Sequence, residues 1–279
     1  EVLGWCGERQ DAVTLSTALR AEKSPILRLA EAAAVLKLAS GDPAVLAEQS
    51  LSWAQEALTD ENWAVRESAV ALLGDADPAA AVPLLGKAIR DGQAEVRRSA
   101  AAALGRTKYR PAVEVLTTAI ADKNKEVRVN VLRAIGKVST DLVKKGEKGL
   151  EGELRQKVQA ELVKAADTGD PTEQVVAAAT LLRIGDDSRK DKLQGALKAD
   201  DPELRALAVE ESAADPAMQK ASLASLLKDP DIQVRFRTAC QLADQKDKQA
   251  IPVLREVLEK GGADGLRAYG LLKQLGETA

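Results

Sequence analysis

The chain has 279 residues, of which 45% are apolar but only 2% are aromatic, so its core must be built from aliphatic side chains. It contains no histidine, which excludes the imidazole base of Ser/His/Asp and Cys/His catalysis and the commonest side-chain ligand of transition metals. The net charge of -3 provides no overall basic field, so nucleic acid is not the expected partner.

The cysteine count and the hydropathy pattern narrow the class of protein further. Cys6 and Cys240 are too few and too far apart for a zinc site or a disulfide framework, so we expect two inert core thiols, no metal and no cofactor. The sequence has no run of about 18 apolar residues, which predicts no membrane span.

The first residues carry neither a start methionine nor a signal sequence. Val2-Leu-Gly-Trp-Cys-Gly7 is typical of the end of a helix, so we expect the N-terminus to be truncated within a repeat. The cytoplasm is the favoured compartment, and a periplasmic or secreted location stays open because the natural N-terminus is expected to lie upstream.

One motif recurs along the chain, an Asp followed six residues later by the Arg of a Val-Arg pair. The first three of these arginines are spaced by 31 residues. The Asp and Arg of the four clear copies are Asp60 and Arg66, Asp91 and Arg97, Asp122 and Arg128, and Asp229 and Arg235. Apolar residues at helical spacing follow each of the first three copies and end at Gly74, Gly105 or Gly136, which predicts a helix with a glycine C-cap.

Another amphipathic stretch precedes each Asp, so each unit reads as helix, tight turn and helix. Weaker copies have Leu-Arg in place of Val-Arg, and one copy at Val176-Ala177 has lost the Arg. The weaker copies are Leu27-Arg28, Leu204-Arg205 and Leu266-Arg267, with Glu22 and Gly261 at the Asp position of the first and last. Counting second helices by residues 28, 66, 97, 128, 177, 205, 235 and 267 predicts eight units.

Proline supports this phasing, because most prolines stand where a helix is about to begin and the missing N–H costs least. These are Pro43, Pro78, Pro111, Pro171, Pro202, Pro216 and Pro230. Pro83 and Pro252 are instead expected inside the first helix of their units, where each should bend the helix.

The repeated Asp and Val-Arg pairs, the internal prolines and the Ala/Leu/Gly helix ends resemble the HEAT repeat, in particular the short variety found in the phycobilin lyase group. The resemblance implies an all-α, right-handed α-solenoid of about eight helix pairs, forming a single domain over residues 1–279. In that family the Asp and Arg form a hydrogen-bonded ladder between adjacent units. The resemblance therefore implies a structural role for the eight Asp and Arg residues given above.

An insertion interrupts the array between Arg128 and Ala177, where the interval grows to 49 residues. We expect an inserted loop at about residues 139–152, rich in Gly, Lys and Glu. Loops carry function more often than the helices they connect, so a binding role is one hypothesis and a merely mobile segment is the other.

No catalytic motif emerges. Gly86-Lys87 and Gly136-Lys137 lack the first glycine of a phosphate-binding loop. The acidic pairs Asp186-Asp187 and Asp200-Asp201 are expected to cap helices rather than to act as acid and base. We therefore expect that the protein is not an enzyme.

The remaining candidate site is the inner face of the second helices, at positions two, three and six after the motif Val. Arginine and aromatic side chains there are favoured interface anchors, which predicts a concave ridge for an acidic or extended protein partner. The alternative is that they are solvated or partly buried helix residues. The candidate partner-binding residues are Arg98, Asn130, Arg133, Phe236, Arg237 and Tyr269.

Three functions remain open from the sequence. The first is a non-enzymatic interaction module or assembly scaffold that binds another protein on its concave face. The second is a bilin lyase or chaperone-like subunit acting on a partner protein, as the family resemblance suggests. The third is a DNA-binding or DNA-glycosylase-like solenoid, which the acidic charge disfavours. The oligomeric state and the identity of the partner are not predicted.

Overall fold

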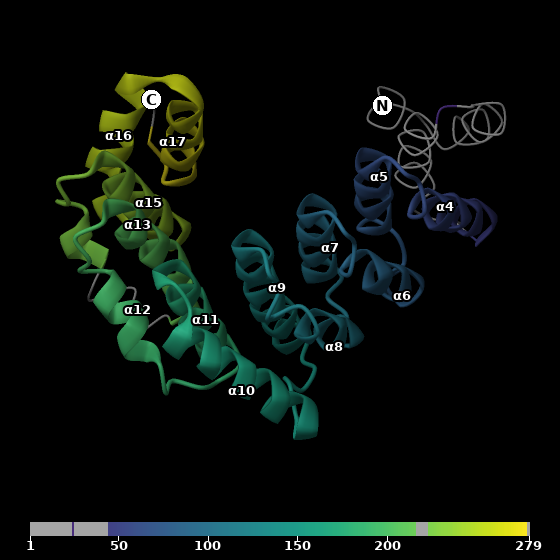
Figure 1. Ribbon diagram of the computed structural model, residues 1–279. Helices are drawn as coiled ribbons and strands as arrows, with labels where there is room; N and C mark the ends of the chain where they lie inside the picture. The colour runs from purple at the N-terminus through teal and green to yellow at the C-terminus, as the bar shows by residue number, and fades with distance from the viewer. Residues whose placement is uncertain (1–23, 25–43, 216–222, 278–279) are drawn as a thin grey trace. The chain divides into compact units, whose positions relative to one another are not determined.

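The computed structural model describes Ser24 and residues 44–215 and 223–277, and these residues form helices and connecting turns without a strand (Figure 1). The chain divides into two compact units, Glu1–Arg155 and Gln156–Ala279, which we treat separately. The predictions made for Cys6, Glu22, Arg28, Pro43 and Pro216, and for the end of a helix at residues 2–7, lie outside the described residues.

The first unit contains consecutive helix pairs in which the second helices stack in order, α7 lying between α5 and α9 (Figure 1). Its helices are α4 (Ala44–Ala57), α5 (Trp63–Leu73), α6 (Pro78–Ala88), α7 (Ala94–Arg106), α8 (Pro111–Thr117) and α9 (Lys125–Lys144). Each pair is antiparallel with a short turn at the repeated Asp, as the sequence predicts.

The second unit continues the same arrangement, with α13 and α15 packed side by side. Helix α10 (Gly152–Thr168) begins in the last residues of the first unit, and most of it belongs to the second. The other helices of the second unit are α11 (Pro171–Arg183), α12 (Lys190–Ala196), α13 (Pro202–Glu211), α15 (Ile232–Asp244), α16 (Ile251–Lys260) and α17 (Gly262–Gln274), with 3-10 turns η1 (Ser212–Ala214) and η2 (Lys248–Ala250). The predicted positions 66, 97, 128, 177, 205, 235 and 267 fall in α5, α7, α9, α11, α13, α15 and α17. The fold is an α-solenoid.

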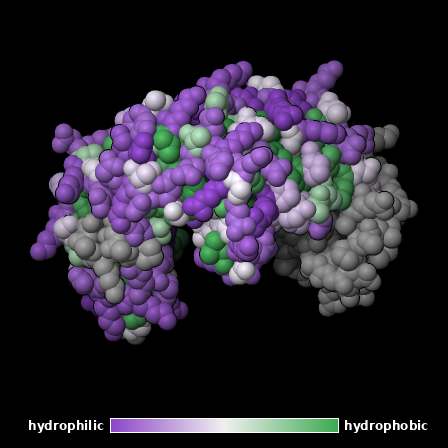
Figure 2. Space-filling model, turned by 90° about the horizontal axis from the view of Figure 1, so that it is seen from below, coloured by the Kyte–Doolittle hydropathy of each residue, from purple (hydrophilic) through white to green (hydrophobic). Residues whose placement is uncertain are grey.

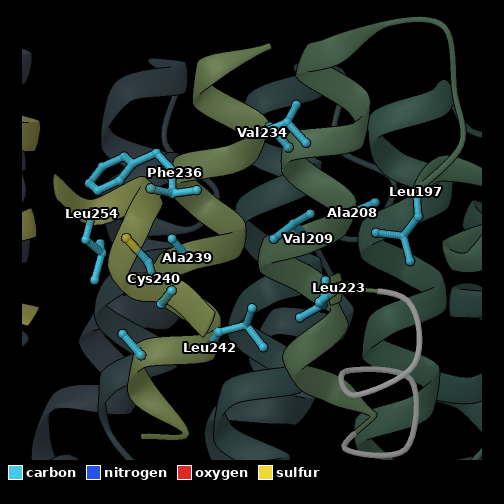
Figure 3. Close-up of a cluster of buried hydrophobic side chains, with 14 of the residues drawn as sticks. Leu197, Ala208, Val209, Leu223, Val234, Phe236, Ala239, Cys240, Leu242 and Leu254 are labelled. Atoms are coloured by element: carbon cyan, nitrogen blue, oxygen red, sulfur yellow. The ribbon is translucent and has the colours of Figure 1, made fainter. Parts of the chain in front are cut away.

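The core is aliphatic, as the composition predicts. In the second unit it is a cluster of Leu, Val and Ala side chains with one ring, Phe236, beside Leu254 and Cys240 (Figure 3). Cys240 is 5% exposed, and burial raises the pKa of its thiol to about 11. The thiol is therefore protonated at neutral pH, which confirms the prediction of an inert core cysteine at this position.

The helix starts follow their capping residues. Asn62, Asn124 and Asp231 stand at N-caps and accept hydrogen bonds from backbone N–H groups of the first helical turn. The prolines predicted to open helices do so at α6, α8, α11 and α13, whereas Pro230 precedes α15 by two residues. Pro83 lies inside α6, as predicted. The prediction for Pro252 is wrong, because it occupies the first turn of α16 just after η2, where no N–H donor is needed.

The predicted glycine C-caps need correction. Gly74 does cap α5, but with an ordinary helical φ of -66°, and Gly105 and Gly136 lie inside α7 and α9. The reason for Gly105 is packing: a Cβ built there would lie 2.9 Å from the Cβ of Ala134 and 3.0 Å from its Cα. Glycine at this position lets consecutive second helices approach closely. A left-handed glycine does end α11, at Gly185 with a φ of 81°.

The inserted loop is shorter than predicted. Helix α9 continues to Lys144, because Ser139 and Leu142 are 2% and 1% exposed and hold these extra turns against the core. The connection between α9 and α10 consists of residues 145–151 alone.

The predicted register of the last repeat is also wrong. The motif Val is buried at Val65, Val96, Val127 and Val234, whereas Leu266 is 76% exposed. Its neighbour Gly265 is buried instead and lies against the backbone carbonyls of α16. Since one residue turns a helix by about 100°, a shift of one position moves the side chain from the core to the surface.

Candidate functional site

The repeated Arg is first held by its own turn. The Nη1 of Arg97 donates to the backbone carbonyls of Asp91 at 2.8 Å and Gly92 at 3.1 Å, the residues six and five positions earlier. The same pair of bonds recurs at Arg66, Arg128, Arg205 and Arg235. The six-residue spacing in the sequence thus places the guanidinium over the turn that begins its helix.

The other side of the guanidinium reaches the turn of the next repeat. Arg97 donates from Nε and Nη2 to both carboxylate oxygens of Asp122, at 2.7 and 2.8 Å. Arg66 binds Asp91 at the same distances, and Arg205 binds Asp229 at 2.8 Å through both atoms. Such two-point contacts are stronger and more directional than single charged hydrogen bonds. Within each of the two compact units, these Arg and Asp residues therefore form a ladder that joins the turn of one repeat to the turn of the next.

Each acidic residue of the ladder also orders its own turn. Asp60, Asp91, Asp122 and Asp229 accept a hydrogen bond from the backbone N–H two residues later, at 2.8 to 2.9 Å. The carboxylate therefore fixes the shape of the turn that starts its second helix.

The ladder is modified where the motif is degenerate. Ala177 has no guanidinium, and the position that would receive it in the next unit, six residues before Arg205, is Ala199. Both partners are missing together, so no buried charge is left unpaired. Gly261 likewise offers no carboxylate to Arg235, which binds Oε1 of Glu256 on α16 at 2.6 Å instead. Sequence reasoning identified Arg205 as a weaker copy but did not place it in the ladder.

The ladder shifts the pKa of its carboxyl groups. The Arg66 guanidinium, helped by the N–H of Gln93, holds the pKa of Asp91 below its ordinary value, and Arg205 does the same to Asp229. At Asp122 burial opposes the shift, but the hydrogen bonds from Arg97 and from the backbone outweigh it and the pKa is again lowered.

These shifts predict acid sensitivity. Because the pKa is lower in the folded than in the unfolded state, the stabilisation is complete above the unfolded value of about 3.9 and is lost as the pH falls toward the folded values. We expect the urea midpoint of unfolding to fall steeply below about pH 4. Asp122→Asn should be less stable at pH 7, and its urea midpoint should fall less steeply below about pH 4. Parallel curves for the two proteins would contradict this origin of the acid sensitivity.

Among the polar members of the predicted ridge, Arg98 and Arg133 are exposed, and Asn130 and Arg237 are partly buried. Arg98 binds Oε2 of Glu126 at 2.9 Å, with the two side chains 44% and 69% exposed, and the side chain of Asn130 donates to the Glu126 carbonyl. In the second unit Arg237 pairs with Glu210, and these side chains are 40% and 42% exposed. The pairs join neighbouring second helices, and they lack a sequence signature because the partners are 27 or 28 residues apart.

The remaining ridge residues differ from one another. Arg133 is exposed on α9, and Tyr269 is 41% exposed on α17, with the Nζ of Lys273 5.4 Å from its ring centroid. The prediction for Phe236 is wrong: it is 3% exposed and belongs to the core cluster (Figure 3). A ring two residues after Val234 is buried because α15 packs against helices on both sides.

The second unit has a groove beside one of these pairs. It has a volume of about 520 Å³ and lies between α13 and the first half of α15. Ala206 and Leu207 supply its apolar lining, and Glu210 and Arg237 supply charge.

The described residues offer little for other chemistry. Among them, no group of three or more cysteine or carboxylate side chains is placed to hold a metal ion. Asp201 caps α13, as predicted, and Asp186 accepts hydrogen bonds from Ser188 and Gln159. Nor do these ranges contain a helix that is both long and apolar enough to cross a membrane.

Stacked antiparallel helix pairs joined by an Arg-Asp ladder define a helical-repeat protein. The chain belongs to the HEAT-repeat proteins: HEAT repeats match residues 12–104, 51–136 and 82–150, and the PBS lyase HEAT-like repeat matches residues 234–260. This confirms the family resemblance stated from the sequence. No curated protein matches the sequence.

Several solved structures are similar in fold at low sequence identity. Escherichia coli YibA is 19% identical, with 83% of this chain and 85% of that chain covered and a TM-score of 0.46. The CpcE–CpcF complex of phycocyanin lyase from Nostoc sp. PCC7120 is 16% identical, covering 81% and 94%, with a TM-score of 0.48. Human deoxyhypusine hydroxylase is 20% identical, covering 99% of each chain, with a TM-score of 0.41. These similarities concern the fold and carry no functional argument.

Proposed function

We propose that the protein is a non-enzymatic interaction module that binds a partner protein along the concave face of its second helices. The observation that carries the proposal is the pair of exposed ionic contacts between neighbouring second helices, Arg98 with Glu126 and Arg237 with Glu210. Exposed ion pairs contribute only about 0 to 1 kcal/mol to folding. With exposed fractions of 44% and 40%, both arginine side chains are accessible to a partner.

These pairs suit the binding of an acidic or extended segment. Each guanidinium is already oriented by an internal carboxylate, and a carboxylate of the partner can replace that internal group at little cost. The groove beside Arg237 adds an apolar lining for a neighbouring side chain of the segment. Together these features supply charge, direction and apolar contact, which are the elements of an interface anchor.

The chemistry of the described residues supports the same proposal. The chain has no histidine, and arginines bind the ladder residues Asp91, Asp122 and Asp229. The described thiol, Cys240, is buried and protonated at neutral pH. HEAT repeats as a family also favour an interaction scaffold.

A charge-reversal experiment tests the proposed face. We expect the triple variant Arg98→Glu, Arg133→Glu and Arg237→Glu to lose the partners that the wild-type protein retains in a pull-down, because the guanidiniums become carboxylates. The matched control is Lys123→Glu, Lys198→Glu and Lys228→Glu, which changes the net charge equally at exposed turns. Recovery of identical partners by all three proteins would overturn the concave-face proposal.

A second candidate function is a bilin lyase or chaperone-like subunit. The match of the PBS lyase HEAT-like repeat to residues 234–260 favours it over a DNA-binding role. A coloured adduct formed when the protein, a bilin and an acceptor protein are mixed would support it. Salt-dependent binding of duplex DNA would instead favour the DNA-binding solenoid.

A further inference from the structure

A group of lysines lies at one edge of the first unit, where the α9–α10 connection meets the α7–α8 turn. We call Lys108, Lys144, Lys145 and Lys148 the basic edge; all four are exposed. The Nζ of Lys145 donates to the backbone carbonyl of Lys108 at 3.2 Å, which joins the two segments. Residues far apart in the sequence thus present their charges together.

The connection that carries this edge is anchored. Arg110 donates from Nη1 to the carbonyl of Gly149 at 3.0 Å and from Nη2 to the carbonyl of Lys148. Leu150 is 3% exposed and packs into the core. Gly146, with a φ of 76°, turns the chain out of α9. A binding partner would therefore meet lysines on an ordered segment and would not have to order it.

Three of the four lysines of the basic edge form no ion pair within the described ranges. Lys148 lies 3.7 Å from Glu151 in an ion pair whose side chains are 81% and 58% exposed. Within the described ranges, Lys108, Lys144 and Lys145 have no carboxylate within 4.0 Å. The negative end of α9 explains a preference for Lys144 and Lys145 in its last turn, but that effect fades within one turn and does not account for Lys108 or Lys148.

An apolar side chain lies beside these charges. Val143 is 56% exposed, one of four large hydrophobic residues that stand out at the described surface. The face of the molecule seen in Figure 2 is mostly hydrophilic with small separate hydrophobic patches. Val143 gives a partner an apolar contact in addition to charge.

We propose that the basic edge is a second docking site, which binds a short acidic segment of a partner protein that carries an apolar side chain. Glu147 and Glu151 lie among the lysines, so the positive charge covers a short stretch rather than the long track that a phosphate backbone needs. Lysines are also point charges that suit carboxylates in several orientations. This site uses residues separate from the proposed concave face and is independent of it.

Fluorescence anisotropy with a labelled Asp/Glu-rich peptide containing one leucine tests this site. We expect the wild-type protein to bind the peptide with an affinity that falls as salt is raised. The variant Lys144→Glu, Lys145→Glu and Lys148→Glu should bind at least about tenfold more weakly. The matched control Lys123→Glu, Lys198→Glu and Lys228→Glu should stay within about twofold of the wild type.

The proposal would be overturned by no binding by the wild type, by equal loss in the control variant, or by tighter binding of single-stranded DNA of equal charge than of the peptide. The Arg98→Glu, Arg133→Glu and Arg237→Glu variant separates the two sites. Retained peptide binding by this variant supports the basic edge. If it loses the peptide while the lysine variant keeps it, the peptide occupies the concave face, and the basic-edge proposal fails while the proposed function stands.

Discussion

We expect Arg97→Ala to lower the free energy of unfolding by about 3 kcal/mol. The side chain is 5% exposed and makes four hydrogen bonds, two to carbonyls of its own turn and two to Asp122. Its removal leaves the Asp122 carboxylate, which is 10% exposed, without its counter-charge. Removing one partner of a buried pair costs far more than the pair contributes. The lost hydrogen bonds to Asp122 also join neighbouring repeats, and the stability of a solenoid depends on such contacts.

Urea unfolding followed by circular dichroism at pH 7 measures this effect. Arg98→Ala is the matched control, since it removes the same side-chain type one residue later on the same helix, from a pair that is 44% and 69% exposed. We expect it to cost at most about 1 kcal/mol. Removing Asp122 as well, in Arg97→Ala with Asp122→Ala, should recover part of the loss. Equal destabilisation by Arg97→Ala and Arg98→Ala would contradict a structural role for the ladder.

The ladder was the most predictable part of the structure. Its residues repeat at fixed spacing, and the resemblance to HEAT repeats supplies the expectation of bonds between units. The observed contacts join Arg66 to Asp91 and Arg97 to Asp122, each 25 residues further along the chain. A repeat of similar units places every turn beside the next one, so a local motif determines a non-local contact. At the end of the array, Gly261 has no carboxylate and Arg235 binds Glu256 instead. This contact follows from the same geometry, but the repeated motif gives no signal for it.

The surface residues were less predictable, because exposure depends on the register of each helix against its neighbours. Phe236 was expected on the ridge and is buried, and Leu266 was assigned to the position of the motif Val, which is buried in the clear copies, but is exposed. Both errors arise from counting positions from a motif Val without knowing which helices pack on either side. The Arg98–Glu126 contact could not be predicted for a related reason: its partners lie in successive repeats and neither is the Asp, Val or Arg of the repeated motif.

The glycine inside α7 gives a sharper test of this packing. We expect Gly105→Ala to destabilise the fold by about 2 kcal/mol, because the new Cβ would lie 2.9 Å from the Cβ of Ala134 and 3.0 Å from its Cα. Neither atom can rotate away, so α7 and α9 must separate along their contact. The same substitution at Gly270, inside α17, meets no atom within 4 Å and should stabilise by about 0.5 to 1 kcal/mol through helix propensity alone. Urea unfolding measures the change in the free energy of unfolding for both variants. Changes of opposite sign would show that close helix packing, and not a conformational need for glycine, is the reason for Gly105. Stabilisation by Gly105→Ala would mean that α7 and α9 do not require this close approach.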